Sequence, residues 1–247
     1  MSDEQDPLVY REFLNSSAPP DNRRRVALDV STDVEREKQL AAEAAAELVE
    51  EGMTVGLGTG STSRYFLTAL AARRLELVCV ATSPATERTA CNLGLSVEPF
   101  AAGSKLARLD IAVDGADQVA RDGWIVKGAG GAHTREKIVA AAAERFVVIV
   151  SSDKVVDEIG PPIPLELHAF GLAATLARLG EARLRSEQAT PDGGVLADWI
   201  GPVADSAGLA TWLAAMPGVV EHGLFAPELV SEVLVGRGDK VERIGPR

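Results

Sequence analysis

A loop rich in glycine and hydroxyl residues is the first part of this chain that could bind a ligand. It lies between a short apolar run and an expected helix, and its members are Gly58, Thr59, Gly60, Ser61 and Thr62. The first backbone N–H groups of a helix are free to bind an anion, and glycines let the ligand approach the backbone closely. We therefore predict a phosphate site here. The plainer alternative is a tight strand-to-helix turn without a ligand.

This loop matches neither of the two common nucleotide-binding patterns. A Walker A loop requires Gly-Lys-Ser/Thr after a fixed gap, which the chain lacks. A dinucleotide fingerprint requires a third glycine and an acidic residue after the next strand, where this chain has Thr82-Ser83. We therefore expect no nucleotide cofactor.

Two carboxylates follow a second apolar run. Asp114-Gly115-Ala116-Asp117 ends an expected strand, and ligands of parallel sheets bind at the carboxyl ends of the strands. An isolated Asp-Gly pair is usually an Asx turn with a helix cap. A third polar segment further along the chain favours a site over a simple turn.

That segment, residues 127–137, combines a cation, glycines and a carboxylate. Its glycines include Gly128, Gly130 and Gly131. Beside Lys127 they can form a pocket for the oxyanion of a developing enediolate. Glu136 lies in the first turn of the next expected helix, where its plain role is to complement the helix dipole, worth about 0.3–1 kcal/mol. With the other polar loops predicted at the same edge, we interpret Glu136 as a proton-transfer base.

The elements that position these loops alternate between strand and helix. Helices are expected at 34–51, 63–72, 85–93 and 134–145, and strands at 53–57, 77–81, 111–113 and 146–150. This alternation predicts an α/β fold with a parallel sheet covered by helices on both faces. Residues 1–33 show no such pattern and are expected to form an irregular N-terminal extension.

The pattern changes at Gly160-Pro161-Pro162, which predicts a domain boundary. Helices near 168–179 and 206–215 and strands near 182–188 and 195–199 predict a small α+β domain over residues 160–227. The segments 231–235 and 240–244 resemble a hairpin that returns to the first domain. We therefore expect a Rossmann-like domain formed by residues 34–159 and 228–247.

The overall charge argues against nucleic acid as a partner. The chain has 25 Lys and Arg against 36 Asp and Glu, for a net charge of −11, and no stretch gathers enough basic residues to oppose it. An anionic substrate must then be bound by a few local donors.

Cysteine, histidine and hydropathy patterns indicate a cytoplasmic protein without a metal. Cys79 and Cys91 have neither metal-ligand spacing nor a disulfide framework. The three histidines are scattered along the sequence, so no metal site is expected. Residues 1–33 lack the apolar core of a secretory signal, and no apolar run approaches the length of a membrane span.

Taken together, the loops resemble those of the type A ribose-5-phosphate isomerases, from about residue 34 to residue 244. The motifs that carry the resemblance occur in the family's order: Gly58-Thr59-Gly60-Ser61-Thr62, Asp114-Gly115-Ala116-Asp117, residues 127–137, Pro164-Leu165-Glu166 and residues 217–225. The resemblance implies a Rossmann-like domain with a second, smaller α+β domain. It also implies a homodimer or homotetramer that needs neither metal nor nucleotide.

The implied reaction converts ribose 5-phosphate to ribulose 5-phosphate through an enediolate, in the non-oxidative branch of the pentose phosphate pathway. Glu136 matches the family's base, which carries the proton between C2 and C1. Asp114 and Asp117 match the carboxylates for ring opening and hydroxyl binding, and Lys127 matches the cation on the oxyanion side.

Other residues match the substrate-binding positions of the family. The loop 58–62 matches its phosphate loop, and Lys38 and Lys154 stand where family members present a Lys to the substrate. The sequence also departs from the family pattern, at Gln118, Ala129, His133, Ser151, Asp153 and Gly194. Because the base and the carboxylates match, we expect the chemistry to be kept, while the identity of the sugar depends on these departures.

Three rival functions remain open from the sequence. One is a non-catalytic sugar-phosphate sensor of the same fold, although residues 1–33 are too short for a DNA-binding module. Another is an isomerase of a different sugar phosphate. The third is a coenzyme A transferase, whose related fold uses a glutamate as nucleophile in a larger architecture.

Overall fold

The structure is a computed structural model that describes residues 22–245, without the side chains of residues 22–32 and 186–188. The elements from Asp33 onward belong to one compact unit, separate from residues 1–32. Helix α1 (Asn22–Ala46) begins earlier than the predicted start at residue 34 and ends before residue 51. Residues 22–33 contain no Gly or Pro, so nothing in them prevents a helix. The expected irregular extension is thus helical from Asn22, and its residues 1–21 lie outside the described residues.

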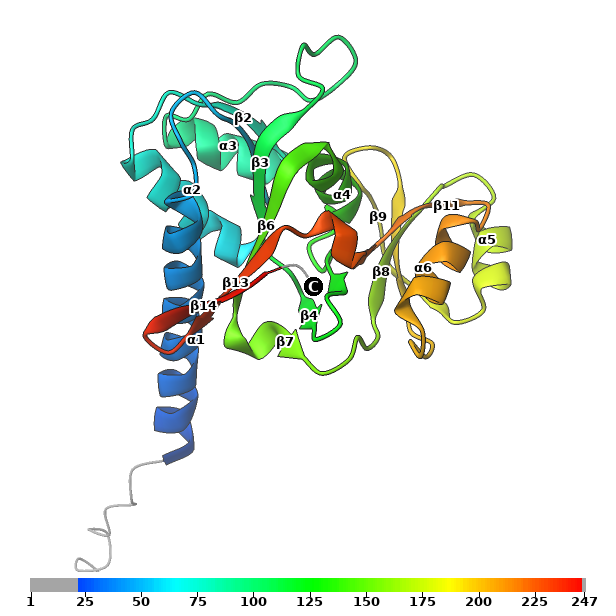
Figure 1. The fold of residues 1–247 in the computed structure, drawn as a ribbon. Helices are drawn as coiled ribbons and strands as arrows, with labels where there is room; N and C mark the ends of the chain where they lie inside the picture. The colour runs from blue at the N-terminus through cyan, green and yellow to red at the C-terminus, as the bar shows by residue number, and fades with distance from the viewer. Residues whose placement is uncertain (1–21, 246–247) are drawn as a thin grey trace, which may run out of the picture. The chain divides into compact units, whose positions relative to one another are not determined.

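A six-stranded sheet lies at the centre of this unit, in the order β14-β13-β6-β3-β1-β2 (Figure 1). All neighbouring strands run parallel except β13 and β14, which form an antiparallel hairpin. The strands are β1 (Thr54–Leu57), β2 (Val78–Ala81), β3 (Leu109–Asp114), β6 (Ala143–Ser151), β13 (Glu232–Arg237) and β14 (Lys240–Ile244). The predicted parallel α/β sheet is confirmed.

Helices cover the sheet on both faces because its strands are apolar on both sides. Val147 and Ile149 pack with α1 and with α2 (Ser61–Ala72), whereas Val148 and Val150 pack in the core that contains α4 (His133–Ala142). Helix α3 (Pro84–Asn92) joins the α1 and α2 side. Alternate residues of one strand thus enter two cores, as expected for a strand buried on both faces.

A four-stranded antiparallel sheet has the order β11-β8-β10-β9. Its strands are β8 (Ile163–Leu167), β9 (Ala182–Ala189), β10 (Val195–Trp199) and β11 (Val219–His222). Helices α5 (Leu172–Leu179) and α6 (Ser206–Ala214) pack into one core on this sheet, and Figure 1 shows them side by side. The boundary predicted at residues 160–227 stays a prediction, although this sheet and its helices fall within it.

A third sheet of very short strands was not predicted. It has the order β12-β5-β4-β7, with β4 (Gln118–Ala120), β5 (Ile125–Val126), β7 (Val155–Val156) and β12 (Leu224–Phe225). Single 3-10 turns, η1 (Ser152–Lys154) and η2 (Pro227–Leu229), follow β6 and β12. Strands of two or three residues are too short to show an alternating pattern, which explains why the sequence does not reveal them.

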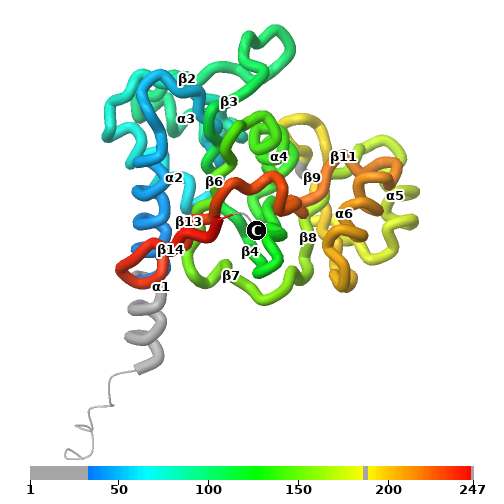
Figure 2. The backbone as a smooth tube through the Cα atoms, viewed as in Figure 1, coloured from blue at the N-terminus to red at the C-terminus, as the bar shows by residue number. Residues whose placement is uncertain are grey.

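One further difference concerns the end of helix α4. Helix α4 stops at Ala142, and residues 143–145, expected as helix, begin strand β6 because they pair with β3. The C-terminal hairpin returns to the first sheet as expected: β13 pairs with β6, and Figure 2 shows the two side by side. Gly236 of β13 pairs with Ser151 at the end of β6, so the turn that follows β6 lies close to the hairpin.

Candidate active site

The carboxyl ends of β1 and β3 meet at one edge of the six-stranded sheet, and the predicted loops meet there too. A cavity of about 260 Å³ is lined by Lys38, Thr59, Gly60, Ser61, Thr62, Gly115, Ala116, Asp117, Lys127, Gly128, Ala129, Gly130, Glu136 and Lys154. This set includes all but three of the predicted site residues. Of the exceptions, Gly58 and Asp114 are buried behind the lining, and Gly131 lines a smaller neighbouring cavity of about 80 Å³.

Lys127 joins the two buried carboxylates of the site. Its Nζ lies 3.0 Å from Asp114 Oδ2 and 3.2 Å from Glu136 Oε2, and it also donates to the carbonyl oxygen of Gly115. At most 6% of each of these three side chains is exposed. Asp114 Oδ2 and Glu136 Oε2 accept no hydrogen bond from any other described residue, so Lys127 is what compensates their charge.

The electrostatics of this cluster favour proton transfer at Glu136. Burial raises the pKa of Glu136 to about 8, the charge of Asp114 adds to the rise, and Lys127 opposes it. The pKa of Asp114 is also raised, chiefly by burial. Burial acts to lower the pKa of Lys127, but the charges of Asp114 and Glu136 outweigh it and the pKa is raised. Glu136 therefore titrates near neutral pH, where a general acid or base works best.

Asp114 is fixed by the start of α2 as well as by Lys127. Its Oδ1 accepts hydrogen bonds from Thr59 N at 3.0 Å, Ser63 Oγ at 3.1 Å and Gly115 N at 2.7 Å. A Cβ atom on Gly58 would lie 2.1 Å from the Asp114 carboxyl group, so only glycine fits there. Gly58 thus makes room for Asp114, and Ser63 is a site residue that its sequence context did not reveal.

The predicted phosphate loop opens α2. Gly60 is the residue before the helix, with φ 120°, a conformation that favours glycine. Ser61 and Thr62 start the first turn, whose N–H groups have no partner within the helix. The hydroxyl of Thr59, in contrast, lies against three others, those of Thr82 at 2.8 Å, Ser83 at 2.9 Å and Thr86 at 3.0 Å. Its side chain joins β2 and α3 to the loop.

Two lysines lie at the rim of the cavity. Lys38 pairs with Glu35 at 2.6 Å and is 13% exposed, whereas Lys154 pairs with Asp153 at 3.4 Å and is 38% exposed. They reach the cavity from α1 and from η1, which are far apart in the sequence. They can therefore add positive charge to a site in a strongly acidic protein.

The loop 127–131 is held from three sides. Asp117 Oδ2 accepts from Ala129 N at 2.8 Å. Arg185 of β9 donates to the carbonyl oxygens of Gly128 at 2.7 Å and Ala129 at 3.0 Å. His133 packs under Gly128, where a Cβ atom would meet its ring at 2.6 Å. Nothing in the sequence around Arg185 connects it with this loop.

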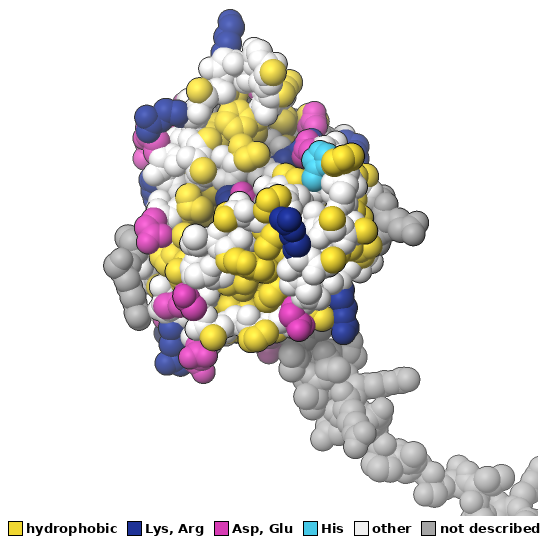
Figure 3. Space-filling view, turned by 90° about the vertical axis from the view of Figure 1, so that its right-hand side faces the viewer, with side chains coloured by type: hydrophobic (Ala, Val, Ile, Leu, Met, Phe, Trp, Pro, Cys, Tyr) yellow, Lys and Arg dark blue, Asp and Glu magenta, His cyan; other side chains and the backbone are white. Residues whose placement is uncertain are grey.

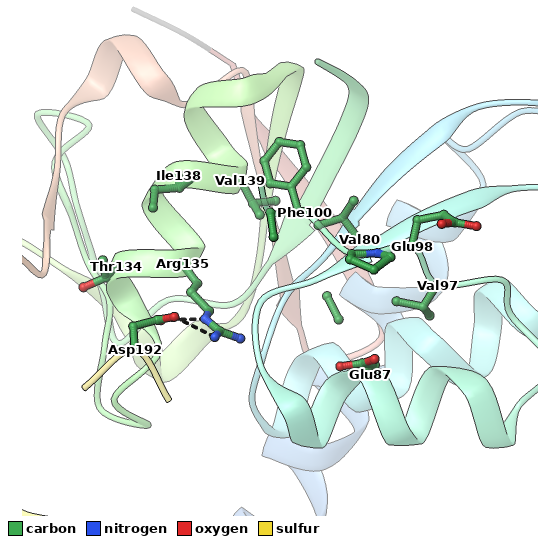
Figure 4. A pocket seen from close by; sticks show the side chains of 13 residues that line it. Val80, Glu87, Val97, Glu98, Phe100, Thr134, Arg135, Ile138, Val139 and Asp192 are labelled. Atoms are coloured by element: carbon green, nitrogen blue, oxygen red, sulfur yellow. Dashed lines mark hydrogen bonds and ion pairs between the residues drawn. The ribbon is translucent and has the colours of Figure 1, made fainter. Parts of the chain in front are cut away.

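Helix α4, which carries Glu136, is anchored to the four-stranded sheet. Arg135 forms a two-point ion pair with Asp192, at 2.6 and 2.7 Å (Figure 4). Lys137 donates to Glu221 Oε1 and to the carbonyl oxygen of His222, both at 2.7 Å. The residues on either side of the base are thus fixed to the neighbouring sheet.

Several departures from the family pattern have partners in the structure. Gln118 makes two hydrogen bonds with the backbone of Gly160, at 2.7 and 2.9 Å, and it does not line the cavity. A Cβ atom on Gly194 would lie 2.1 Å from Glu166 Oε1, so a side chain has no room there. Ser151 donates to Asp153 beside Lys154. These four residues are accommodated outside the loops that carry the base and its cation.

A larger cavity of about 440 Å³ is lined in part by Arg135 and Asp192 (Figure 4). Its walls are largely apolar, with Val80, Phe100, Ile138 and Val139 among them. It contains no buried ionisable cluster comparable to the three charges around Lys127. The smaller cavity is therefore the candidate active site.

The described residues contain no arrangement suited to a metal ion: no group of three His, Cys, Asp or Glu side chains is placed to hold one. No helix in the described part of the chain is both long enough and apolar enough to span a bilayer.

Comparison with known proteins agrees with this geometry. The sequence profile of ribose 5-phosphate isomerase A (phosphoriboisomerase A) matches residues 78–240. Ribose-5-phosphate isomerase A of Gluconobacter oxydans is 41% identical over 232 residues, which cover 87% of this chain and 99% of the relative. The chain therefore belongs to the ribose 5-phosphate isomerase A family. It is an isomerase, and a non-catalytic sensor is not favoured.

Solved structures agree at the level of the fold. Ribose 5-phosphate isomerase A from Methanocaldococcus jannaschii superposes with a TM-score of 0.78 at 32% identity, covering 84% of this chain and 97% of that chain. A D-ribose-5-phosphate isomerase in complex with phospho-erythronic acid superposes with a TM-score of 0.80 at 30% identity, covering 86% and 99%. The Rossmann-like fold with a smaller α+β part is thereby confirmed.

Proposed function

We propose that this chain interconverts ribose 5-phosphate and ribulose 5-phosphate, with Glu136 as the proton-transfer base. The observation that carries the proposal is the buried Glu136 carboxyl group, whose pKa of about 8 and contact with Lys127 suit it to exchange a proton inside the cavity. The related enzyme solved with phospho-erythronic acid binds a phosphorylated sugar acid. A phosphorylated sugar is the substrate class that fits a cavity lined by the predicted phosphate loop as well as by Lys127 and Glu136.

In the proposed reaction Glu136 removes the proton from C2 of the open-chain aldose. The electron pair forms the C1–C2 double bond and negative charge develops on the C1 oxygen. The base then delivers a proton to C1, while the C2 hydroxyl proton passes to the C1 oxygen and C2 becomes the carbonyl carbon. Lys127, whose side chain is 2% exposed, stabilises the developing oxygen charge.

The remaining residues bind the sugar and its phosphate. The free N–H groups of Gly60, Ser61 and Thr62 bind the phosphate at the start of α2, with Lys38 and Lys154 at the rim. Asp114 and Asp117 act on the sugar hydroxyls and in ring opening. Asp117 lines the cavity, whereas Asp114 lies behind it, so Asp117 makes the direct contact and Asp114 works chiefly through Lys127.

The central test is Glu136→Gln, which keeps the shape of the side chain but removes its basicity. We expect a loss of kcat of about 10²–10⁴-fold with little change in affinity for inorganic phosphate. Glu232→Gln is the control, because Glu232 also pairs with a cation, Arg145, but lies outside the cavity. Near-normal turnover of Glu136→Gln would leave Glu136 as a helix-terminus charge and reject the mechanism.

Solvent isotope exchange gives an independent measurement. A proton held on a carboxylate can exchange with solvent before it is returned. Wild-type protein in deuterated water should therefore place deuterium at C1 of the ketose product. Turnover without any such incorporation means that the transferred hydrogen never reaches solvent, and it contradicts an exchangeable proton on Glu136.

We also propose that the chain works as a homodimer or homotetramer in the cytoplasm. Hydrophobic side chains gather on the face shown in Figure 3, and the four-stranded sheet and its helices expose Phe170 (88%), Leu184, Trp212 and Val220. Exposed apolar patches of this kind are typical of contacts between proteins. Light scattering coupled to gel filtration tests the assembly, and a monomeric mass contradicts it.

The proposed cytoplasmic location rests on the cysteines: the free thiols of Cys79 and Cys91 support a reducing compartment.

A further inference from the structure

Arg185 is the one described residue of β9 that reaches the loop beside the cavity. Its Nη1 donates to the carbonyl oxygens of Gly128 and Ala129, at 2.7 and 3.0 Å. Its Nε and Nη2 are held by Asp198 at 2.7 and 2.6 Å, so the guanidinium has a fixed orientation. All of these contacts are made by a side chain that is 20% exposed.

Because the peptide bond is planar, these contacts also fix the directions of the N–H groups of Ala129 and Gly130. In a trans peptide the C=O of one residue and the N–H of the next point in opposite directions. With the Gly128 carbonyl aimed at Arg185, the Ala129 N–H must point the other way, and it donates to Asp117 Oδ2 on the cavity side. By the same rule, the Gly130 N–H must point away from Arg185 and toward the cavity that Gly130 lines.

No described residue accepts a hydrogen bond from the Gly130 N–H. Gly128 and Gly131 have φ values of 109° and 74°, so this loop uses glycine conformations and has little intrinsic stiffness. A donor aimed at a developing charge helps only if its direction is fixed before the reaction. The Arg185 contacts to two successive carbonyls are what fix it.

We propose that Arg185 is a positioning residue, which aims the Gly130 N–H at the enediolate oxygen that Lys127 also faces. The inference rests on the proposed function and adds to it a residue of the four-stranded sheet. Arg185 does not touch the cavity itself, and Asp198 neutralises its charge. Its effect is therefore transmitted through the two carbonyls and not through a long-range field.

The test is Arg185→Ala, compared with Arg183→Ala as a matched control. Both changes remove an arginine from the same face of β9, but the Arg183 side chain is exposed and makes no hydrogen bond or ion pair with any described residue. For Arg185→Ala we expect kcat to fall about 10–100-fold, less than the full loss of an oxyanion donor. KM and the inhibition constant of inorganic phosphate should change less than threefold, and Arg183→Ala should keep kcat within threefold of wild type.

Chemical rescue separates positioning from a purely structural role. Millimolar guanidinium chloride should restore part of the kcat of Arg185→Ala, whereas tetramethylammonium chloride at the same ionic strength should not. Arg185→Lys should have an intermediate kcat, because an ammonium group cannot bond two carbonyls and Asp198 with the same fork. If Arg185→Ala does not fold, Arg185→Lys decides by the same kcat and phosphate measurements.

Three results would overturn the inference: wild-type kcat in a folded Arg185→Ala, an effect confined to KM, or equal rescue by both salts. These outcomes differ from a failure of the proposed function. If Glu136→Gln also turns over normally, the mechanism itself is wrong. If the Arg185 variants turn over normally but Glu136→Gln does not, the mechanism stands and the positioning role of Arg185 is rejected.

Discussion

The ammonium group of Lys127 lies 3.2 Å from the carboxyl group of Glu136, and both side chains are almost fully buried. Asp114 faces the same ammonium group at 3.0 Å, so one positive charge meets two acidic groups. A buried charge without a partner is costly, and the cluster relieves this by holding one extra proton. The pKa of Glu136 is raised to about 8 and that of Asp114 is raised as well, so the two carboxyl groups hold this proton between them. For Glu136 to act as a base, the cluster must lose this proton.

The pH dependence of kcat/KM should therefore rise through an apparent pKa near 8 instead of near 4.5, and level off above it. This value belongs to the coupled cluster of Asp114, Lys127 and Glu136. Asp114→Asn removes the negative charge that raises the pKa of Glu136, so its midpoint should move to lower pH, whatever its effect on the maximal rate. A midpoint that stays near 4.5 in the wild type contradicts this assignment of the base.

Lys127→Met should lower kcat about 10²–10³-fold while changing KM much less, because the oxygen charge that Lys127 stabilises exists mainly in the transition state. The variant removes the only cation of the buried cluster, so the pKa of Glu136 should rise further. Steady-state kinetics across pH measures both effects. A change in KM alone would make Lys127 a ground-state binding residue.

The phosphate loop should divide into binding and structural residues. Ser61→Ala combined with Thr62→Val should raise KM and the inhibition constant of inorganic phosphate together. The double change removes two hydroxyl donors at the first turn of α2, where the phosphate is proposed to bind. Thr59→Val should instead lower the thermal midpoint, because the Thr59 hydroxyl bonds to those of Thr82, Ser83 and Thr86. If the double variant binds phosphate as well as wild type does, the phosphate site is misplaced.

Two buried histidines should contribute a loss of stability as the pH drops below the usual histidine pKa of 6.5, because both are neutral in the folded protein. Burial lowers the pKa of both His133 and His222 to about 4. Between these values the unfolded chain binds more protons than the folded chain, so each histidine costs up to about 1.4 kcal/mol per pH unit as the pH falls. The raised pKa values of Glu136 and Asp114 act in the opposite direction.

Urea unfolding at pH 7 and pH 5, compared between the wild type and His222→Asn, cancels that opposing contribution because both proteins contain Glu136 and Asp114. His222→Asn should lose less stability over this range than the wild type does, because it lacks one of the two titrating rings. Equal losses in both proteins would show that His222 is not neutral when folded.

Metal removal should leave activity unchanged, since we expect no metal cofactor. The measurement is turnover after exhaustive treatment with EDTA. A loss of activity that added divalent metal restores would contradict the expectation.

Much of the fold could be predicted because its repeating unit has a strong local signature. Apolar runs such as 77–81 and 146–150 are long enough to be recognised as strands, and the helices between them end at clear breaks. The four strands of the third sheet could not be found, because elements of two or three residues carry no period. Residues 143–145 have ordinary helix-forming character, and only their pairing with β3 makes them strand.

The candidate site was predictable where its residues lie in loops at the sheet edge. Lys127 and Asp117 lie in such loops and Glu136 in the first turn of the helix that follows, and a parallel sheet brings these segments together. Ser63 and Arg185 were missed for a physical reason: one lies inside a helix, the other within a strand of a different sheet. Their partners, Asp114 and the loop 127–131, are distant in sequence, and no local pattern records such contacts.

The contacts of Arg185 make the catalytic loop depend on the four-stranded sheet, although none of the described residues of that sheet lines the cavity. Proteins open in cooperative parts whose free energies differ, and an antiparallel sheet with its own helices can be one of them. An opening of β8 to β11 would release the carbonyls of Gly128 and Ala129 while the six-stranded sheet stays folded. Turnover then reports the closed population of the second sheet, so hydrogen exchange in β9 and loss of activity on mild heating should follow the same curve.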